Sequence, residues 1–183
     1  MGPGLPGQRS VLVDDDRRFV EERWSLPAGT LRTEPGGGTV ELFTRMAAGG
    51  VNACWIMCTN PIASVANRGT VIAGLEAAEL VITQDAFVET ETNAYADIVL
   101  PAAMWAEGDG VMVNSERTLV LARGAVDPPA GALADWQLIA RIACAMGFAH
   151  AFTYSFGITG SSRCEGCWGS WKILCSTVLL LQM

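Results

Sequence analysis

Apolar and polar residues are arranged along the chain in blocks that predict helices and strands in turn. Two short, continuously apolar runs, residues 52–58 and 79–85, predict strands that are buried on both faces. Between them, residues 64–78 have a helical pattern, although Gly69 and Gly74 weaken it. Because a strand, a helix and a strand follow one another with short links, we expect an α/β fold with a parallel, Rossmann-like sheet.

Three more segments have helical spacing. Residues 14–24 begin with three Asp residues, and residues 39–50 start at Thr39, the expected N-cap. Residues 134–148 predict a clearly patterned helix, which should end at Gly147. Its apolar face is expected to comprise Trp136, Ile139, Ile142 and Ala143.

Shorter elements and breaks complete the predicted organisation. Residues 89–96 predict a helical turn, residues 97–102 a short strand that Pro101 ends, and residues 111–126 one or two strands. The expected divisions are an irregular lead-in with a short helix, an α/β domain and an irregular C-terminal tail without sustained periodicity. Their boundaries are residues 1–37, 38–154 and 155–183.

Length, charge and apolar content narrow the class of protein. The 183 residues suffice for one domain with a real core, and half of them are apolar. With 12 basic and 19 acidic residues the net charge is −7, which argues against nucleic acid as the main partner. The first ten residues lack the apolar core of a signal peptide, and no apolar run reaches spanning length. We therefore expect a cytoplasmic protein that binds no membrane.

The six cysteines fall into two groups. Cys54, Cys58 and Cys144 lie in or beside predicted elements and are expected to be buried free thiols. Cys164–Cys167 form a C-x2-C pair, with Cys175 as a third thiol. A structural metal needs four ligands, and no nearby fourth Cys or His completes the set, so we expect no metal site.

Polar residues follow both predicted central strands. Asn60 lies in the turn Cys58–Pro61 after the first strand, and Gln84-Asp85 end the second. Ligands of open parallel sheets bind beyond the carboxyl ends of the strands, and an Asp there can accept the N–H donors of a ribose or a guanine edge. For Asn60 the spacing alone favours an ordinary turn that caps the next helix; for Gln84 and Asp85 the two interpretations stay open.

A third polar cluster occupies residues 107–117. Glu107, Asp109, Asn114, Glu116 and Arg117 crowd into a glycine-bearing segment. Such density suits a polar site or a subunit contact, but a solvated hairpin loop with an internal ion pair explains it first.

Taken together, these residues resemble the third domain of the molybdopterin oxidoreductase family, closest to bacterial assimilatory nitrate reductases. The resemblance covers about residues 5–154. It rests on the combination T-N-P, Q-D-x-F-x-x-E-T, A-D-x-V-L-P-A and N-x-E-R, which includes "WIMCTNPIAS" and "ELVITQDAFVETETNAYADIVLPA".

The resemblance implies an enzyme that carries molybdenum on two molybdopterin guanine dinucleotides, with an iron–sulfur cluster (4Fe-4S) in the nitrate reductase branch. Nitrate would be reduced to nitrite with electrons from a donor. In the family this domain holds one guanine dinucleotide. The contacts that carry over to this chain are Asn60, Gln84, Asp85, Gly108 and Asp135.

Two positions depart from the family pattern. Gly108 stands where the family usually has lysine, which removes a cation that could pair with the cofactor. Thr118 stands where a second arginine often follows Glu-Arg. Each change is expected to weaken cofactor binding or local ion pairing.

Other family features have no counterpart in the sequence. The four-cysteine cluster motif, the residue that ligates molybdenum and the domain that closes over the second dinucleotide are not found. We therefore expect a part of a reductase that is inactive alone, and we assign no catalytic residue. Residues 155–183 are expected to come from a shifted reading frame or a misassembled end. Formate dehydrogenase or another oxidoreductase with the same cofactor is the alternative within the family. A non-catalytic nucleotide-binding module is the alternative outside it.

Overall fold

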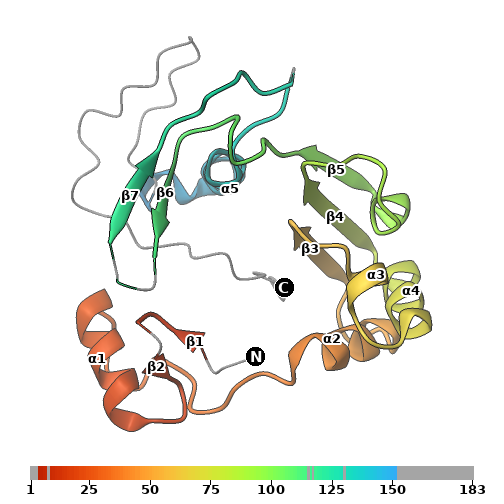
Figure 1. Cartoon of the computed structure of the whole chain (residues 1–183). Coiled ribbons are helices and arrows are strands. Elements are labelled where there is room, and N and C mark those ends of the chain that lie inside the picture. Colours follow the sequence, from red (N-terminus) through yellow and green to blue (C-terminus); the bar gives the residue numbers. More distant parts are fainter. Residues whose placement is uncertain (1–3, 8, 115, 117, 130, 152–183) are drawn as a thin grey trace.

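A three-stranded parallel sheet forms the centre of the computed structural model, which describes residues 4–7, 9–114, 116, 118–129 and 131–151. The strands lie in the order β3-β4-β5, with bounds Ala53–Met57, Leu80–Asp85 and Ile98–Pro101. In register, Met57 pairs with Gln84 and Asp85 with Pro101, so the three strands end at one edge of the sheet. Figure 1 shows their arrowheads on the same side. The α/β class and the parallel sheet predicted from the sequence are confirmed.

One face of this sheet carries the core. It is covered by two helices that pack on each other, α2 (Gly38–Ala47) and α4 (Arg68–Ala77). The buried residues shared by these elements include Phe43, Met46, Cys54, Ile56, Val71 and Val81. Gly74 is a packing requirement, not a flaw in the helix: an added Cβ would lie 2.9 Å from the carbonyl oxygen of Phe43.

Two predicted helix starts were wrong. The segment after β3 is not one helix from residue 64: a short α3 (Pro61–Ser64) ends first, and α4 begins after Asn67. Asn67 has a left-handed conformation, and its side chain accepts a hydrogen bond from the N–H of Thr70, which is a standard N-cap. Thr39 is not an N-cap either, because α2 begins one residue earlier with Gly37 at the cap position and no side-chain cap.

The chain returns to the sheet edge after residue 101. A short 3-10 turn η1 (Asn93–Tyr95) precedes β5, and an isolated parallel bridge joins Ala102 to Leu133. This bridge brings the start of α5 (Asp135–Ala143) to the carboxyl ends of the strands, where Figure 1 shows the helix. After α5 the chain continues as a wider turn η2 (Cys144–Phe148) and a 3-10 turn η3 (Ala149–Ala151).

The apolar face predicted for α5 does not contain the residues that are buried. The buried residues of the helix are Leu138 and Ala140, whereas Trp136, Ile139, Ile142 and Ala143 are only half-buried. Gly147 does interrupt the helical backbone, with φ 92°.

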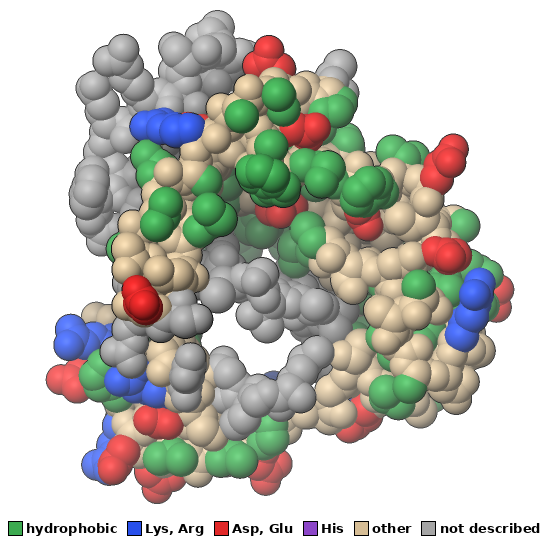
Figure 2. All heavy atoms as spheres, viewed as in Figure 1, with side chains coloured by type: hydrophobic (Ala, Val, Ile, Leu, Met, Phe, Trp, Pro, Cys, Tyr) green, Lys and Arg blue, Asp and Glu red, His purple; other side chains and the backbone are tan. Residues whose placement is uncertain are grey.

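Residues 110–122 form an antiparallel hairpin of β6 (Gly110–Val113) and β7 (Leu119–Ala122), which confirms two strands in this segment. Six large apolar side chains of the hairpin are each more than a third exposed: Val111, Met112, Val113, Leu119, Val120 and Leu121. Figure 2 shows hydrophobic side chains on the surface over these strands. A two-stranded hairpin with both faces wet has little stability of its own.

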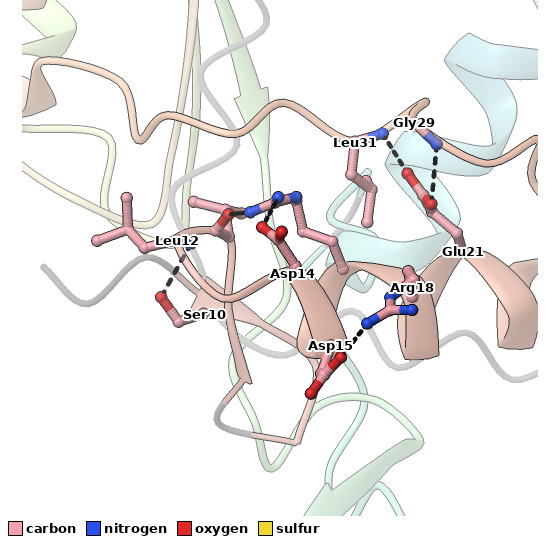
Figure 3. Close-up of polar contacts among 10 residues, drawn as sticks. Ser10, Leu12, Asp14, Asp15, Arg18, Glu21, Gly29 and Leu31 are labelled. Atoms are coloured by element: carbon pink, nitrogen blue, oxygen red, sulfur yellow. Dashed lines mark hydrogen bonds and ion pairs between the residues drawn. The ribbon is translucent and has the colours of Figure 1, made fainter.

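The lead-in carries a small unit of its own. The strands β1 (Gly4–Leu5) and β2 (Arg9–Ser10) pair with each other and contact α1 (Asp14–Trp24), whose predicted bounds are confirmed. The carboxylate of Glu21, on the buried side of α1, accepts hydrogen bonds from the N–H groups of Gly29 and Leu31 at 3.0 and 2.8 Å (Figure 3). It thereby fastens the loop after the helix.

The expectations for the C-terminal tail cannot be compared with the structure, and the expectation for membrane spans can be compared only in part. The tail after Ser155, the pair Cys164–Cys167 and Cys175 lie outside the described residues. Within the described part, no helix combines the length and the apolar character that a membrane span requires.

Candidate functional site

The carboxyl ends of β3 and β4 meet the first residue of α5. The side-chain amide of Gln84 donates a hydrogen bond from Nε2 to Oδ1 of Asp135 at 2.7 Å. Because an ionised carboxylate can only accept, this contact also fixes which end of the amide is nitrogen. Gln84 is fully buried, and its Oε1 is a buried atom that has no hydrogen-bond partner among the described residues.

Cys58 is the second residue that faces Asp135. It follows β3, has a left-handed backbone (φ 52°), and its N–H donates to the carbonyl of Gln84 at 2.8 Å. Its Sγ lies 3.4 Å from both carboxylate oxygens of Asp135. Desolvation, followed by the negative charge of Asp135, raises the pKa of the Cys58 thiol to about 12. The thiol is therefore protonated at neutral pH and acts as a donor.

The exposure of Cys58 corrects one sequence expectation. Cys54 is a buried free thiol as predicted, but Cys58 is exposed at the sheet edge and Cys144 is half-buried. Burial raises the pKa of the Cys54 thiol to about 11, so this thiol is inert as well.

Asn60 lies at the same edge, but both ends of its side chain are already bonded. Its Nδ2 donates to Oε2 of Glu91 and its Oδ1 accepts from the hydroxyl of Thr92, each at 2.6 Å. The hydrogen bond from Asn60 is the largest cause that lowers the pKa of Glu91. Asn60 occupies the N-cap position of α3, as the helix-capping interpretation expected, but its side chain makes no capping hydrogen bond. It ties the turn after β3 to the segment before η1.

Asp85 ends β4 next to Gln84. Its Oδ1 accepts the N–H of Phe87 at 2.9 Å, which is an Asx turn and not the cap of a helix. This bond uses one of several lone pairs of a half-buried carboxylate, so Asp85 keeps the capacity to accept further N–H donors.

Gly108 lies beside the residue that precedes Asp135. A Cβ at position 108 would stand 3.3 Å from the Cβ of Ala134, so a side chain here would begin in contact with the residue before α5. The neighbouring Asp109 is tied to the other end of the hairpin. Its carboxylate accepts from the N–H of Gly124 and from Arg123, at 2.9 and 2.8 Å, and these contacts lower its pKa.

A hollow of about 480 Å³ opens between the segment 107–109, residues 124–128 and the start of α5. The indole N–H of Trp136 donates to the carbonyl of Asp109 at 3.1 Å and closes one side of it. The ion pair expected inside the cluster 107–117 is thus formed with Arg123, which lies beyond that cluster; Arg117 lies outside the described residues.

The five predicted positions lie at or near the carboxyl edge of the sheet, and some of them bond directly whereas others are only neighbours. Gln84 and Asp135 bond directly, Asp85 follows Gln84, and Asn60 lies two residues beyond Cys58. Gly108 is near through Ala134 only. Sequence reasoning missed Cys58 as a site residue. Its position at the carboxyl end of a strand is a usable signal, but a thiol beside an apolar run predicts a core residue.

Comparison with known proteins gives the family. The molybdopterin oxidoreductase family profile matches residues 14–145. A nitrate reductase from Synechocystis is 37% identical over 150 residues, which are 82% of this chain and 21% of that protein. The F420-dependent formate dehydrogenase subunit alpha from Methanocaldococcus jannaschii is 36% identical over 152 residues, 82% of this chain and 21% of that protein.

A solved structure agrees. Acetylene hydratase from Pelobacter acetylenicus superposes with a TM-score of 0.57 at 30% identity, over 62% of this chain and 16% of that one. The chain belongs to the molybdopterin oxidoreductase family, whose members carry a molybdopterin cofactor. It spans about a fifth of the length of the curated relatives named above.

Proposed function

We propose that the carboxyl edge of β3 and β4 holds one guanine dinucleotide of a bis-molybdopterin guanine dinucleotide cofactor. The enzyme would be a molybdenum-dependent oxidoreductase that reduces nitrate to nitrite. The observation that carries the proposal is the meeting of Gln84, Asp85 and Asp135 at one strand edge. When bound, molybdenum on its pterin supplies the oxygen-atom and electron transfer, and this chain's residues bind and orient.

The chemistry of the edge fits a guanine better than a phosphate. Asp85 and Asp135 are acceptors, and guanine presents two adjacent N–H donors on its Watson–Crick edge. The buried Oε1 of Gln84 is a further acceptor, and no donor reaches it from the part of the chain that the structure describes. Gly108 supplies no cation, so the pyrophosphate would depend on backbone N–H groups. The residues named Asn60, Gln84, Asp85, Gly108 and Asp135 are the proposed binding set.

Nitrate reduction rests on similarity to relatives. The Synechocystis relative is named a nitrate reductase, and so is a Klebsiella oxytoca relative that is 39% identical over 140 residues, 76% of this chain and 16% of that protein. Formate oxidation is the alternative within the family, because the formate dehydrogenase relative is almost equally similar. Assays of the gene product with nitrate and with formate separate these two functions.

Several finer points belong to the same proposal. An iron–sulfur cluster would pass electrons to molybdenum, and we assign no described residue to it. The α/β unit of residues 38–154 is proposed as the cofactor-binding domain. Cytoplasmic location stays a prediction that cell fractionation tests. A non-catalytic nucleotide-binding module is the alternative of another class; it predicts guanine nucleotide binding without reductase activity in the product of the whole gene.

Titration of the purified chain with GDP tests the binding proposal, with ADP and inosine diphosphate as comparisons. We expect saturable GDP binding, weaker binding of inosine diphosphate, which lacks the 2-amino group, and no binding of ADP. Asp85→Asn and Asp135→Asn should each weaken GDP binding by about tenfold or more, as expected for loss of a charged hydrogen-bond partner. Glu76→Gln, an exposed change on α4, is the control. Equal affinity for GDP and ADP would contradict a guanine site.

A further inference from the structure

Cys58 has a backbone conformation that favours glycine. Its φ of 52° brings a Cβ too close to the following carbonyl, and glycine is the residue that avoids this conflict. A side chain kept in such a position, next to a ligand edge, indicates that the side chain itself is used. The backbone hydrogen bond from the N–H of Cys58 to the carbonyl of Gln84 would survive replacement by glycine.

The thiol and the Gln84 amide hold Asp135 from two strands. Sγ of Cys58 lies 3.4 Å from each carboxylate oxygen, and Nε2 of Gln84 lies 2.7 Å from Oδ1. Both contacts join residues far apart in sequence, 77 and 51 positions. The first residue of α5 is therefore fixed against the ends of β3 and β4.

An independent feature points to a ligand at this place. Gln84 is fully buried, and among the described residues its Oε1 has no hydrogen-bond donor. A buried acceptor of this kind is costly unless a donor arrives. Desolvation and the charge of Asp135 keep the Cys58 thiol protonated, so it donates toward Asp135 and does not act as a nucleophile.

We propose that Cys58 is a positioning residue: its thiol, together with the Gln84 amide, orients the Asp135 carboxylate to accept the N–H edge of a guanine. This inference rests on the proposed function of the site. Cys58 itself is not assigned a contact with the nucleotide; it acts through Asp135.

Three variants of Cys58 in the full chain separate positioning from backbone structure. Cys58→Gly removes the thiol and relieves the left-handed conformation, Cys58→Ala removes the thiol and keeps the conformation, and Cys58→Ser restores a donor. We expect Cys58→Gly to raise the Tm and yet to weaken GDP binding about fivefold. Cys58→Ala should weaken GDP binding similarly without the gain in Tm, and Cys58→Ser should return affinity to within twofold of the parent.

The preference for GDP over inosine diphosphate is the readout that a merely structural residue would not change. We expect this preference to fall in Cys58→Gly and Cys58→Ala and to recover in Cys58→Ser. If Cys58→Gly raises the Tm and leaves both GDP affinity and preference unchanged, Cys58 is only a turn residue and the inference is wrong.

A ligand-free measurement keeps the inference separate from the proposed function. Alkylation of Cys58 by iodoacetamide at pH 8.5, followed by peptide mass spectrometry, should be slow in the parent and at least fivefold faster in Asp135→Asn. Equal rates would show that the two side chains are not coupled and would overturn the inference. If the parent chain binds no GDP, the proposed function fails by itself, and these rates still decide the coupling of Cys58 to Asp135.

Discussion

Gly74 of α4 lies directly against the backbone of Phe43 in α2, so closely that an added Cβ would stand 2.9 Å from the Phe43 carbonyl oxygen. The Cβ of Met46 would be 3.2 Å away on the other side. The contact between these two helices, and hence the covered face of the sheet, depends on this glycine.

Gly74→Ala is therefore expected to destabilise the fold by about 1–2 kcal/mol, because overpacking outweighs the better helix propensity of alanine. Urea unfolding followed by circular dichroism measures the difference. Gly69→Ala in the same helix is the matched control: its added Cβ would meet only Oδ1 of Asn67 at 3.7 Å, and it should be neutral or stabilising. Destabilisation by both changes would mean that the helix, and not the contact, is sensitive.

Replacing Gln84 by an acid tests the bond to Asp135. Gln84→Glu would place a second carboxylate against Asp135 in a fully buried position, so we expect a loss of about 3 kcal/mol at pH 7. The new carboxyl would have a raised pKa in the folded state. Below the unfolded pKa the new carboxyl is protonated in both states and adds no charge penalty. The free energy of unfolding of the variant should then fall as pH rises through the folded pKa. Gln84→Met, which has no charge, should show no such pH dependence; parallel pH profiles would contradict the contact.

Glu21 gives a pH prediction of the opposite sign. Although it is 4% exposed, hydrogen bonds from the N–H groups of Leu31 and Gly29 outweigh desolvation and lower the pKa of its carboxyl from the ordinary value. A lowered folded pKa means that the contribution is complete above the unfolded value and is lost as pH falls through the folded one. Chemical unfolding between pH 7 and 3 should therefore show a steeper acid loss for the parent than for Glu21→Gln.

Glu22→Gln, an exposed change one residue along α1, should keep the parent's pH profile. At pH 7 we expect Glu21→Gln to be less stable than the parent chain and than Glu22→Gln. If Glu21→Gln and the parent lose stability in parallel on acidification, the carboxylate does not fasten the loop after α1.

The hairpin of β6 and β7 should make the chain self-associate. Leu119 and Leu121 are 64% and 54% exposed, and apolar patches of this kind promote aggregation. The double change Leu119→Glu and Leu121→Glu should reduce concentration-dependent association in sedimentation velocity runs. Stability should change by about 0.5 kcal/mol or less at these exposed sites.

Leu12→Glu with Val13→Glu adds the same charge at exposed positions before α1 and serves as the control. We expect it to leave most of the association in place. Equal improvement by both pairs would assign the effect to net charge and not to the hairpin.

The sequence predicted the helices and strands of the fold better than it predicted the contacts at the candidate site. Apolar runs predicted β3 and β4 to within a residue or two, because most positions of both strands are apolar; the buried polar residues Thr83 and Gln84 come near the end of β4. The break between α3 and α4 was missed because the left-handed cap at Asn67 lies in the middle of an otherwise helical pattern. The face of α5 was predicted incorrectly because Leu138 and Ala140 are the buried residues of the helix, and periodicity within one helix does not reveal which face its neighbours cover.

The sequence led to candidate site residues only where strand topology or the family pattern places them. Gln84 and Asp85 end a strand, and the family pattern pointed to Asp135, but their bonding is a matter of three dimensions. Cys58 was missed because a thiol beside an apolar run is usually core, and neither its φ nor its distance to Asp135 is written in local sequence.

The contacts at the sheet edge join residues that are far apart in sequence, and this separation predicts the order in which parts of the fold form. The helices α2 and α4 and the strands β3 and β4 meet through contacts between neighbouring parts of the chain, whereas Asp135 reaches Cys58 across 77 residues. Closing so long a loop costs conformational entropy that nearby contacts do not require. A refolding chain should regain its helical signal first and the proposed affinity for a guanine nucleotide last, so binding at this edge would report completion of the fold and not merely its beginning.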